Sequence, residues 1–263
     1  MKTIFALGGM TLLVCGLAAA QTSSGNRIVI PPRNSSHARQ VKVHAMNVAI
    51  NVKAYDGKDV IVERGAESSR HTEDSHGMHR LDVPRGVTVE EDDNVIEIHS
   101  SPQSNAPDIN VLVPTDTSLD LHTLNGAIHV EGVHGEIVAH TTNGRIEASR
   151  VSGTVVADTL NGKILVTMDS VDQSKPLSFS TLNGPVDVTM PADLKANVRF
   201  KTNHGAIYTD FDVTMGGSLT EPDRSGQGKY RLRTESGLQG RINGGGVDIS
   251  FRTLNASIYL RKK

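Results

Sequence analysis

Thr123-Leu124-Asn125-Gly126, Thr141-Thr142-Asn143-Gly144 and Thr159-Leu160-Asn161-Gly162 decide the fold, because the same four-residue mark returns every 18 residues. A second mark recurs in step, since Val133-His134-Gly135 is followed 18 residues later by Val151-Ser152-Gly153. One repeat therefore contains two turns and two strands. A fixed period of this length predicts a stack of similar units, each of which buries its apolar face against its neighbours.

The mark continues beyond this regular region. Thr181-Leu182-Asn183-Gly184 and Thr202-Asn203-His204-Gly205 follow at wider spacing, and Thr253-Leu254-Asn255-Ala256 closes the chain after a gap. The extra residues fall in loops, so we expect the strands to keep their register. The array then covers residues 119–263, and the Gly- and Ser-rich stretch 216–228 is predicted to be a mobile insertion.

Alternation along the strands indicates which side chains face inward. An apolar residue stands two positions before each threonine, so the threonine and the asparagine belong to the same face as this apolar column. We expect hydrogen-bonded ladders at an inner corner, with a glycine that supplies positive φ. The ladder residues are Thr123, Asn125, Thr141, Asn143, Thr159, Asn161, Thr181, Asn183, Thr253 and Asn255.

A leucine column lies within the same marks, at Leu124, Leu160, Leu182 and Leu254. If threonine and asparagine face inward, these leucines turn outward and form an exposed apolar stripe, which is a candidate partner surface. Alternatively, the corner folds them back into the core. The sequence leaves both alternatives open.

Asn-Gly between alternating strands is also a strong hairpin signal. A hairpin meander would pair different columns, whereas this array repeats the same residue type in the same column. The pattern therefore favours an all-β, right-handed single-stranded β-helix with coils of 18 to 22 residues. Irregular short strands over residues 41–118 are expected to precede it, because the alternation there is interrupted by turns.

The N-terminus is typical of an exported protein. Lys2, an apolar run over residues 4–17 and Ala18-Ala19-Ala20 before Gln21 predict a signal peptide over residues 1–20. The run is shorter than the about 20 residues that span a bilayer, which disfavours a membrane anchor. We expect cleavage to leave no transmembrane segment, a polar lead-in over 21–40, and a single domain over 41–263 in the periplasm or outside the cell.

Composition excludes several classes of function. Cys15 is the only cysteine, and it lies inside the signal peptide, so the exported chain has neither disulfides nor thiol chemistry. The formal charge is −2 and there is no basic run, which argues against nucleic acid as a partner. Tryptophan is absent and aromatic residues make up 3%, so the stacking platforms of many glycan and single-strand binders are missing.

Two groups of side chains are candidates for metal chemistry. His71, His76 and His79 lie with two carboxylates in one polar segment, but their spacing matches no zinc motif, which favours a solvated loop over a metal site. His122, His140 and Asp158 share an outward column, and this group could hold a metal or act as acid and base. We expect no cofactor.

The repeated Thr-Leu-Asn-Gly, the Val113-Pro114-Thr115-Asp116 lead-in and the terminal Gly244-Gly245-Gly246-Val247-Asp248-Ile249 together make residues 41–263 similar to the bacterial adhesin-like β-helix domains. The resemblance implies a single-stranded β-helical fold at the cell envelope or outside the cell. It implies no catalytic residues.

Enzymatic machinery is not visible in the sequence. No Gly-x-Ser-x-Gly, phosphate loop or zinc-protease motif occurs, and the 18-residue alignment sets Glu131 against Ser149 and Glu136 against Thr154. No carboxylate pair of the kind that glycosidases need stacks in the regular coils. We therefore expect a non-enzymatic binding or structural module of the bacterial envelope. The alternatives are a carbohydrate-active β-helix enzyme and a periplasmic metal-binding protein.

The partner is expected to be an envelope or surface protein or a glycan. Self-association through open strand edges is also expected, if the stack ends uncapped beyond Lys263.

Overall fold

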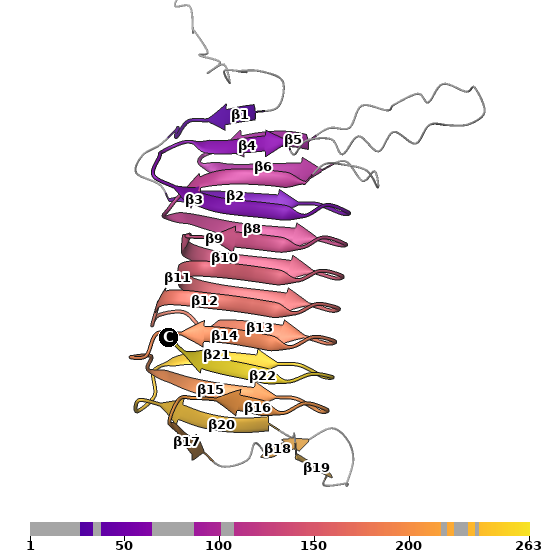
Figure 1. The fold of residues 1–263 in the computed structure, drawn as a ribbon, viewed down its shortest axis with the longest axis vertical. Helices are drawn as coiled ribbons and strands as arrows, with labels where there is room; N and C mark the ends of the chain where they lie inside the picture. The colour runs from indigo at the N-terminus through magenta and orange to yellow at the C-terminus, as the bar shows by residue number, and fades with distance from the viewer. Residues whose placement is uncertain are drawn as a thin grey trace, which may run out of the picture.

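The structure is a computed structural model that describes residues 27–33, 38–64, 87–100, 108–216, 220–223, 231–234 and 237–263. Every regular element in these ranges is a β-strand. Twenty strands form one hydrogen-bonded sheet, and β18 (Thr220–Asp223) and β19 (Arg231–Thr234) form a separate antiparallel pair. Figure 1 shows the large sheet as an elongated stack whose strands run across the long axis.

The repeat forms coils with two walls. In each coil an upstream strand precedes the Asn-Gly corner and a downstream strand follows it, and we call the two sets the upstream wall and the downstream wall. The regular coils are built from β8 (Thr117–Thr123), β9 (Ile128–Glu131), β10 (His134–Thr141), β11 (Ile146–Thr159) and β12 (Ile164–Val171). The long β11 contributes its first half to the downstream wall and its second half to the upstream wall.

Neighbouring coils pair in parallel and in register. Thr141 lies opposite both Thr123 and Thr159, and Ile146 lies opposite both Ile128 and Ile164. Equivalent residues of successive repeats therefore stack on one another, as the 18-residue period predicts. The hairpin alternative is wrong, and the corners line up along one side of the stack (Figure 1).

The last coil of the chain lies inside the stack. The C-terminal half is formed by β13 (Leu177–Thr181), β14 (Val186–Met190), β15 (Ala196–Lys201), β16 (Ile207–Thr209), β21 (Val247–Arg252) and β22 (Ile258–Lys262). Strand β21 pairs with β13 and β15, and β22 pairs with β14 and β16, all in parallel. The expectation that Thr253–Ala256 is the final coil is therefore wrong.

The phenylalanine column agrees with this insertion. Phe251 stacks between Phe179 and Phe200, with ring centroids 5.4 and 5.1 Å apart. Aromatic rings packed at this distance bury a large apolar area between successive coils. The chain reaches the gap because it first runs back along the end of the stack through antiparallel strands.

The N-terminal strands follow the same rule. Strand β2 (Arg39–His44) pairs in parallel with β8 and β6 (Val95–Ser100), and β3 (Ile50–Tyr55) pairs with β9 and β7 (Ile109–Pro114). Strands β2, β3, β6 and β7 are thus parts of parallel coils of the same stack, rather than irregular strands that precede it. Part of the predicted polar lead-in is also ordered, since residues 27–30 form β1.

Antiparallel strands cap both ends. Strands β1 (Arg27–Ile30) and β4 (Val60–Arg64) cover β7, and β5 (Val87–Asp92) covers β6. At the other end β20 (Gly237–Ile242) pairs with β15 and β17 (Val213–Gly216). Lys263 is not at an end, because its backbone N–H bonds to the carbonyl of Met190. The predicted open edge beyond Lys263 is therefore wrong.

The core lies between the walls, where the alternation places it. The inward columns of the upstream wall are Leu121, Ala139, Ala157, Phe179, Phe251 and Phe200, and those of the downstream wall include Ile128, Ile146, Ile164, Val186 and Ile258. All of these side chains are at most 2% exposed. Burial of this apolar area at roughly 25 cal/mol per Å² is the main stabilising term of the stack.

Two predicted segments fall largely outside the described residues. Residues 1–26, which contain the predicted signal peptide, are not described, and the described part of the chain has no helix long and apolar enough to cross a membrane. In the predicted insertion 216–228, Gly216 ends β17 and residues 220–223 form β18, so part of it is a strand.

Candidate binding surface

The threonines of the marks hold neighbouring coils together, and all but the half-buried Thr202 are buried. In four marks the hydroxyl donates a hydrogen bond to the backbone carbonyl of the glycine in the adjacent coil, as Thr141 does to Gly126 at 3.0 Å and Thr159 to Gly144 at 2.9 Å. Thr181 and Thr253 bond in the same way to Gly162 and Gly184. Thr123 donates instead to the carbonyl of Val48, and Thr202 to that of Ala256. The side chains of Thr123, Thr141, Thr159, Thr181 and Thr253 are at most 7% exposed.

The glycine is required for a different reason from the one that the sequence suggests. Gly126, Gly144 and Gly162 are not among the glycines with positive φ, which are Gly132, Gly153, Gly244 and Gly245. A Cβ at Gly144 would lie 1.9 Å from the carbonyl oxygen of Gly126, and a Cβ at Gly162 would lie 1.9 Å from that of Gly144. At these three corners glycine allows the successive backbones to approach closely, whereas Val48 and Ala256 occupy the same position in two other coils.

The asparagines form a ladder on the outside of the corner. Each side-chain Nδ2 donates to Oδ1 of the asparagine in the adjacent coil, at 2.6 to 2.8 Å. The ladder runs through Asn47, Asn125, Asn143, Asn161, Asn183 and Asn255. These bonds are exposed, so the expected inner position of the asparagines is wrong. The chain bends between threonine and asparagine, and strand alternation no longer applies there.

The leucine column is exposed in its N-terminal part. Leu124 and Leu160 are 42% and 45% exposed, whereas Leu182 and Leu254 are half-buried. Met46, 43% exposed, holds the same place in the β2–β3 coil, because the backbone N–H groups of Leu124 and Asn125 bond to its carbonyl. Thr142 interrupts the column. The four leucines therefore do not form one continuous exposed stripe.

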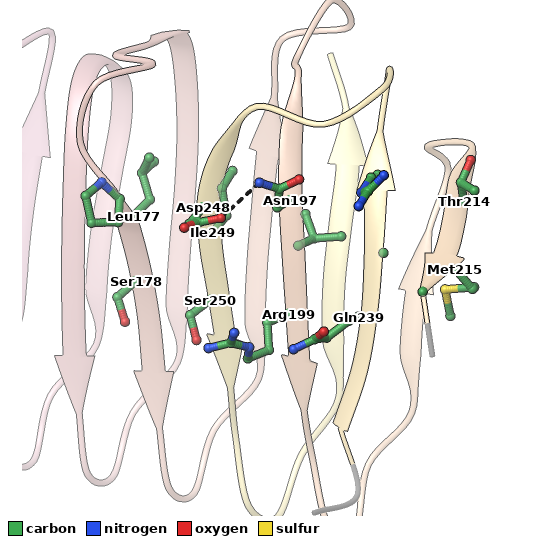
Figure 2. A pocket seen from close by; sticks show the side chains of 15 residues that line it. Leu177, Ser178, Asn197, Arg199, Thr214, Met215, Gln239, Asp248, Ile249 and Ser250 are labelled. Carbon is green, nitrogen blue, oxygen red and sulfur yellow. Dashed lines mark hydrogen bonds between the residues drawn. The ribbon is translucent and has the colours of Figure 1, made fainter. Parts of the chain in front are cut away.

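A groove of about 700 Å³ lies on the outer face of the upstream wall, near the end of the stack that β20 and β17 cap. Figure 2 shows one row of its side chains running across four neighbouring strands. The row is Ser178 on β13, Ser250 on β21, Arg199 on β15 and Gln239 on β20, which are opposite one another in register. Met215 and Thr214 on β17 form its far border.

A second polar row borders the groove. Asp248, Asn197 and Arg241 follow one another in register, and Nδ2 of Asn197 donates to Oδ1 of Asp248 at 3.0 Å and to the carbonyl of Gly246 at 2.8 Å. Within the described residues, neither Arg199 nor Arg241 forms an ion pair. The groove thus offers hydroxyls, amides and two guanidinium groups that form no ion pair with any described residue, at strand spacing.

A smaller hollow on the downstream wall contains two carboxylates. It holds Glu131 and Glu147 and measures about 430 Å³. Glu131 forms ion pairs with Lys53 and Arg150, and Glu147 lies 3.5 Å from Nδ1 of His129. Glu131 faces Ser149 in register, as the sequence alignment predicts. Glu131 therefore acts in ion pairs, and Glu147 contacts His129 of the neighbouring coil and Arg145 of its own coil.

Four histidines stack on the outer face of the upstream wall, which we call the histidine ladder. The order is His99, His44, His122 and His140, and the ring centroids are 5.3, 5.2 and 4.9 Å apart. Asp158 lies next to His140 in register. The sequence predicts the column of His122, His140 and Asp158 but misses His44 and His99, because those strands lie outside the regular 18-residue array.

Polar neighbours fix part of this ladder. Nε2 of His122 lies 2.8 Å from Oδ1 of Asp120, and Nζ of Lys42 donates to Oε1 of Glu97 at 3.0 Å. Burial and the neighbouring His122 and His99 lower the pKa of His44 below its ordinary value. His44 is therefore favoured in its neutral form.

The other predicted metal group is not placed. His71, His76 and His79 lie outside the described residues. Among the residues that the structure describes, no three His, Cys, Asp or Glu side chains already surround a single point at metal-binding distance.

Comparison with known proteins identifies the family. No curated protein matches this chain. In fold, the chain is similar to a "putative cell adhesion protein" from Clostridium sporogenes, at 9% sequence identity and a TM-score of 0.46, over 90% of this chain and 99% of that protein. The sequence model of the Toastrack DUF4097 family matches residues 100–238, which is more than half of the chain and includes all the regular coils. The protein therefore belongs to the Toastrack DUF4097 family.

Proposed function

We propose that this protein is an exported, non-enzymatic binding module of the bacterial cell envelope, and that the groove on the upstream wall is its recognition site. The observation that carries the proposal is the row of Ser178, Ser250, Arg199 and Gln239 across four hydrogen-bonded strands. A stack of paired strands holds such a row rigid, so binding loses little conformational entropy.

The chemistry of the groove suggests an acidic glycan as ligand. Guanidinium groups bind carboxylates and sulfates through paired hydrogen bonds, and hydroxyl and amide groups bind sugar hydroxyls. Strands about 4.8 Å apart present these groups at regular intervals, which suits a linear polymer. Aromatic platforms are absent from the groove lining, so polar and charged contacts must supply the affinity.

Binding to a panel of acidic and neutral polysaccharides tests the proposal. We expect binding to a uronic-acid or sulfated polymer, weakened about tenfold by Arg199→Ala, since a hydrogen bond to a charged group contributes about 1.5–3 kcal/mol. Arg145→Ala removes an exposed arginine outside the groove and serves as the matched control. Equal affinity of the two variants, or no binding to any acidic polymer, would refute the site. Release of reducing ends or unsaturated products from a bound polymer would instead identify an enzyme.

The export and the winding of the coils belong to the same proposal. The signal peptide over residues 1–20 predicts cleavage before Gln21, which N-terminal sequencing of the secreted protein can check. We also propose that the coils follow a right-handed β-helix, because connections between parallel strands of one sheet are right-handed in about 98% of cases. An experimental structure with left-handed coils would overturn this part.

A further inference from the structure

We propose that the histidine ladder, His99, His44, His122 and His140, binds a divalent transition metal, with Cu²⁺ bound most tightly. The ligands of the metal are imidazole nitrogens of neighbouring coils. The site is distinct from the groove and from the loop histidines that the sequence indicates.

The position of the ladder brings ligands of one type together. Four strands that are far apart in sequence, β6, β2, β8 and β10, place one imidazole each on adjacent coils of the same outer wall. The rings stack within 21° of parallel, with neighbouring centroids 4.9 to 5.3 Å apart, so four imidazoles lie side by side on one face. Imidazole is a preferred ligand of Cu²⁺, Zn²⁺ and Ni²⁺, and Cu²⁺ forms the most stable complexes of the series.

A carboxylate orients one ring at the centre of the ladder. The carboxylate of Asp120 can only accept a hydrogen bond, so Nε2 of His122 donates to it and Nδ1 is the nitrogen left for a metal. Carboxylates that orient a ligating histidine in this way are common around metal ions.

The geometry requires a small adjustment. Metal–nitrogen bonds are about 2.0–2.1 Å long, so two nitrogens of one site lie no more than about 4 Å apart. Neighbouring ring centroids are 4.9 to 5.3 Å apart, and His44 and His99 are exposed. Rotation of the exposed rings about their side-chain bonds can bring nitrogens of neighbouring rings within about 4 Å of each other without moving the strands. Water completes the coordination, because no third protein ligand converges within the described residues.

The charges around the ladder also favour a cation. Asp120, Glu97 and Asp158 lie on the coils that carry the histidines, and the strand of His44 also carries Lys42 and the buried Arg39. Lys42 is already paired with Glu97. Asp120 and Asp158 therefore leave the central part of the ladder with a net negative surrounding when the histidines are neutral.

Calorimetric titration of the purified, chelator-treated protein with CuSO₄ and ZnSO₄ at neutral pH tests the inference. We expect saturable binding, tighter for Cu²⁺ than for Zn²⁺, with nitrogen hyperfine structure in the electron paramagnetic resonance spectrum of bound Cu²⁺. His44→Ala combined with His122→Ala should weaken Cu²⁺ binding at least about tenfold. His44→Gln with His122→Gln keeps more of the side-chain volume and replaces the alanine pair if the melting temperature of that pair falls.

Two control variants locate the site. His129→Ala removes a histidine of the opposite wall, and the triple change of His71, His76 and His79 to alanine removes the loop group. Both should retain full Cu²⁺ affinity. The inference is overturned if neither metal produces heat above the buffer control, if binding survives loss of His44 and His122, or if the loop variant abolishes it.

Discussion

The side-chain amide of Asn143 donates a 2.7 Å hydrogen bond to Oδ1 of Asn125, the residue 18 positions earlier in the chain. Oδ1 of Asn143 accepts an equivalent bond of 2.8 Å from Asn161. Asn143 therefore links three coils. Because both bonds are exposed to water, each contributes at the low end of the usual 0.5–1.5 kcal/mol.

Asn143→Ala is expected to lower the free energy of unfolding by about 1 kcal/mol, because it removes both bonds at once. Urea denaturation measures this as a lower midpoint at unchanged slope. Thr142→Ala changes the preceding residue, which is outside the ladder, and should alter stability by less than about 0.5 kcal/mol. Equal effects at the two positions would mean that the asparagine ladder contributes nothing to stability.

Thr159 tests the buried hydroxyl that bonds to the carbonyl of Gly144. Thr159→Val keeps the shape but leaves that carbonyl without its side-chain donor, so we expect a loss of about 1–3 kcal/mol. Thr159→Ser retains the hydroxyl and loses one methyl group, at about 1 kcal/mol. Thermal and urea unfolding of both variants should place valine below serine. The reverse order would show that packing of the methyl group outweighs the hydrogen bond.

Gly144→Ala places a methyl group 1.9 Å from the carbonyl oxygen of Gly126. The two coils must separate locally, and we expect a cost of about 1–3 kcal/mol from overpacking. Ala256 occupies the same position in the last copy of the mark, so the expected result is a less stable fold rather than loss of folding. Gly216→Ala serves as control, because its nearest neighbour is 3.8 Å away. A melting temperature of Gly144→Ala equal to that of the control would contradict the close approach.

Leu160→Lys tests the exposed part of the leucine column. Leu160 is 45% exposed, so a lysine can extend into water and the free energy of unfolding should change by less than about 0.5 kcal/mol. Leu121→Lys, at a position that is 0% exposed, places an unpaired charge in the core and should prevent folding. Circular dichroism melting curves compare the two. A large fall in the melting temperature of Leu160→Lys would show that this leucine packs in the core.

The sequence predicts the local repeat well because that repeat depends on neighbouring residues. Strand alternation and the 18-residue period are enough to place Leu121, Ala139 and Ile146 in the core and to pair equivalent residues in parallel. Alternation fails at the corner, where the bend turns Asn125 outward although Thr123 two residues earlier is buried. At such a bend, the position of a side chain depends on the coil stacked beside it.

The order of the coils could not be predicted in the same way. The insertion of β21 between β13 and β15, and of β2 between β6 and β8, depends on strands that run back along the ends of the stack. The spacing of marks along the chain carries no signal for such a return. For the same reason the sequence predicts His122 and His140 as one column but misses His44 on β2 and His99 on β6, whose coils join the column out of chain order.

Deletion of residues 247–263 distinguishes an inserted coil from a terminal one. If the coils followed chain order, the truncated protein would lose one coil at the end of the stack and keep the rest. In this structure it loses the parallel partners that β15 and β16 have among the described strands, and Phe179 and Phe200 lose the ring of Phe251 between them. We therefore expect residues 196–216 to unfold with the deletion. The slope of the urea transition should then be smaller, because less surface remains to be exposed, and limited proteolysis should cut this segment.

Phe251→Ala in the full chain is the control, because it keeps the coil. It should lower the free energy of unfolding by about 3–5 kcal/mol, and residues 196–216 should stay resistant to proteolysis under native conditions. Protection of residues 196–216 in the truncated protein would show that the last coil does not lie between its neighbours.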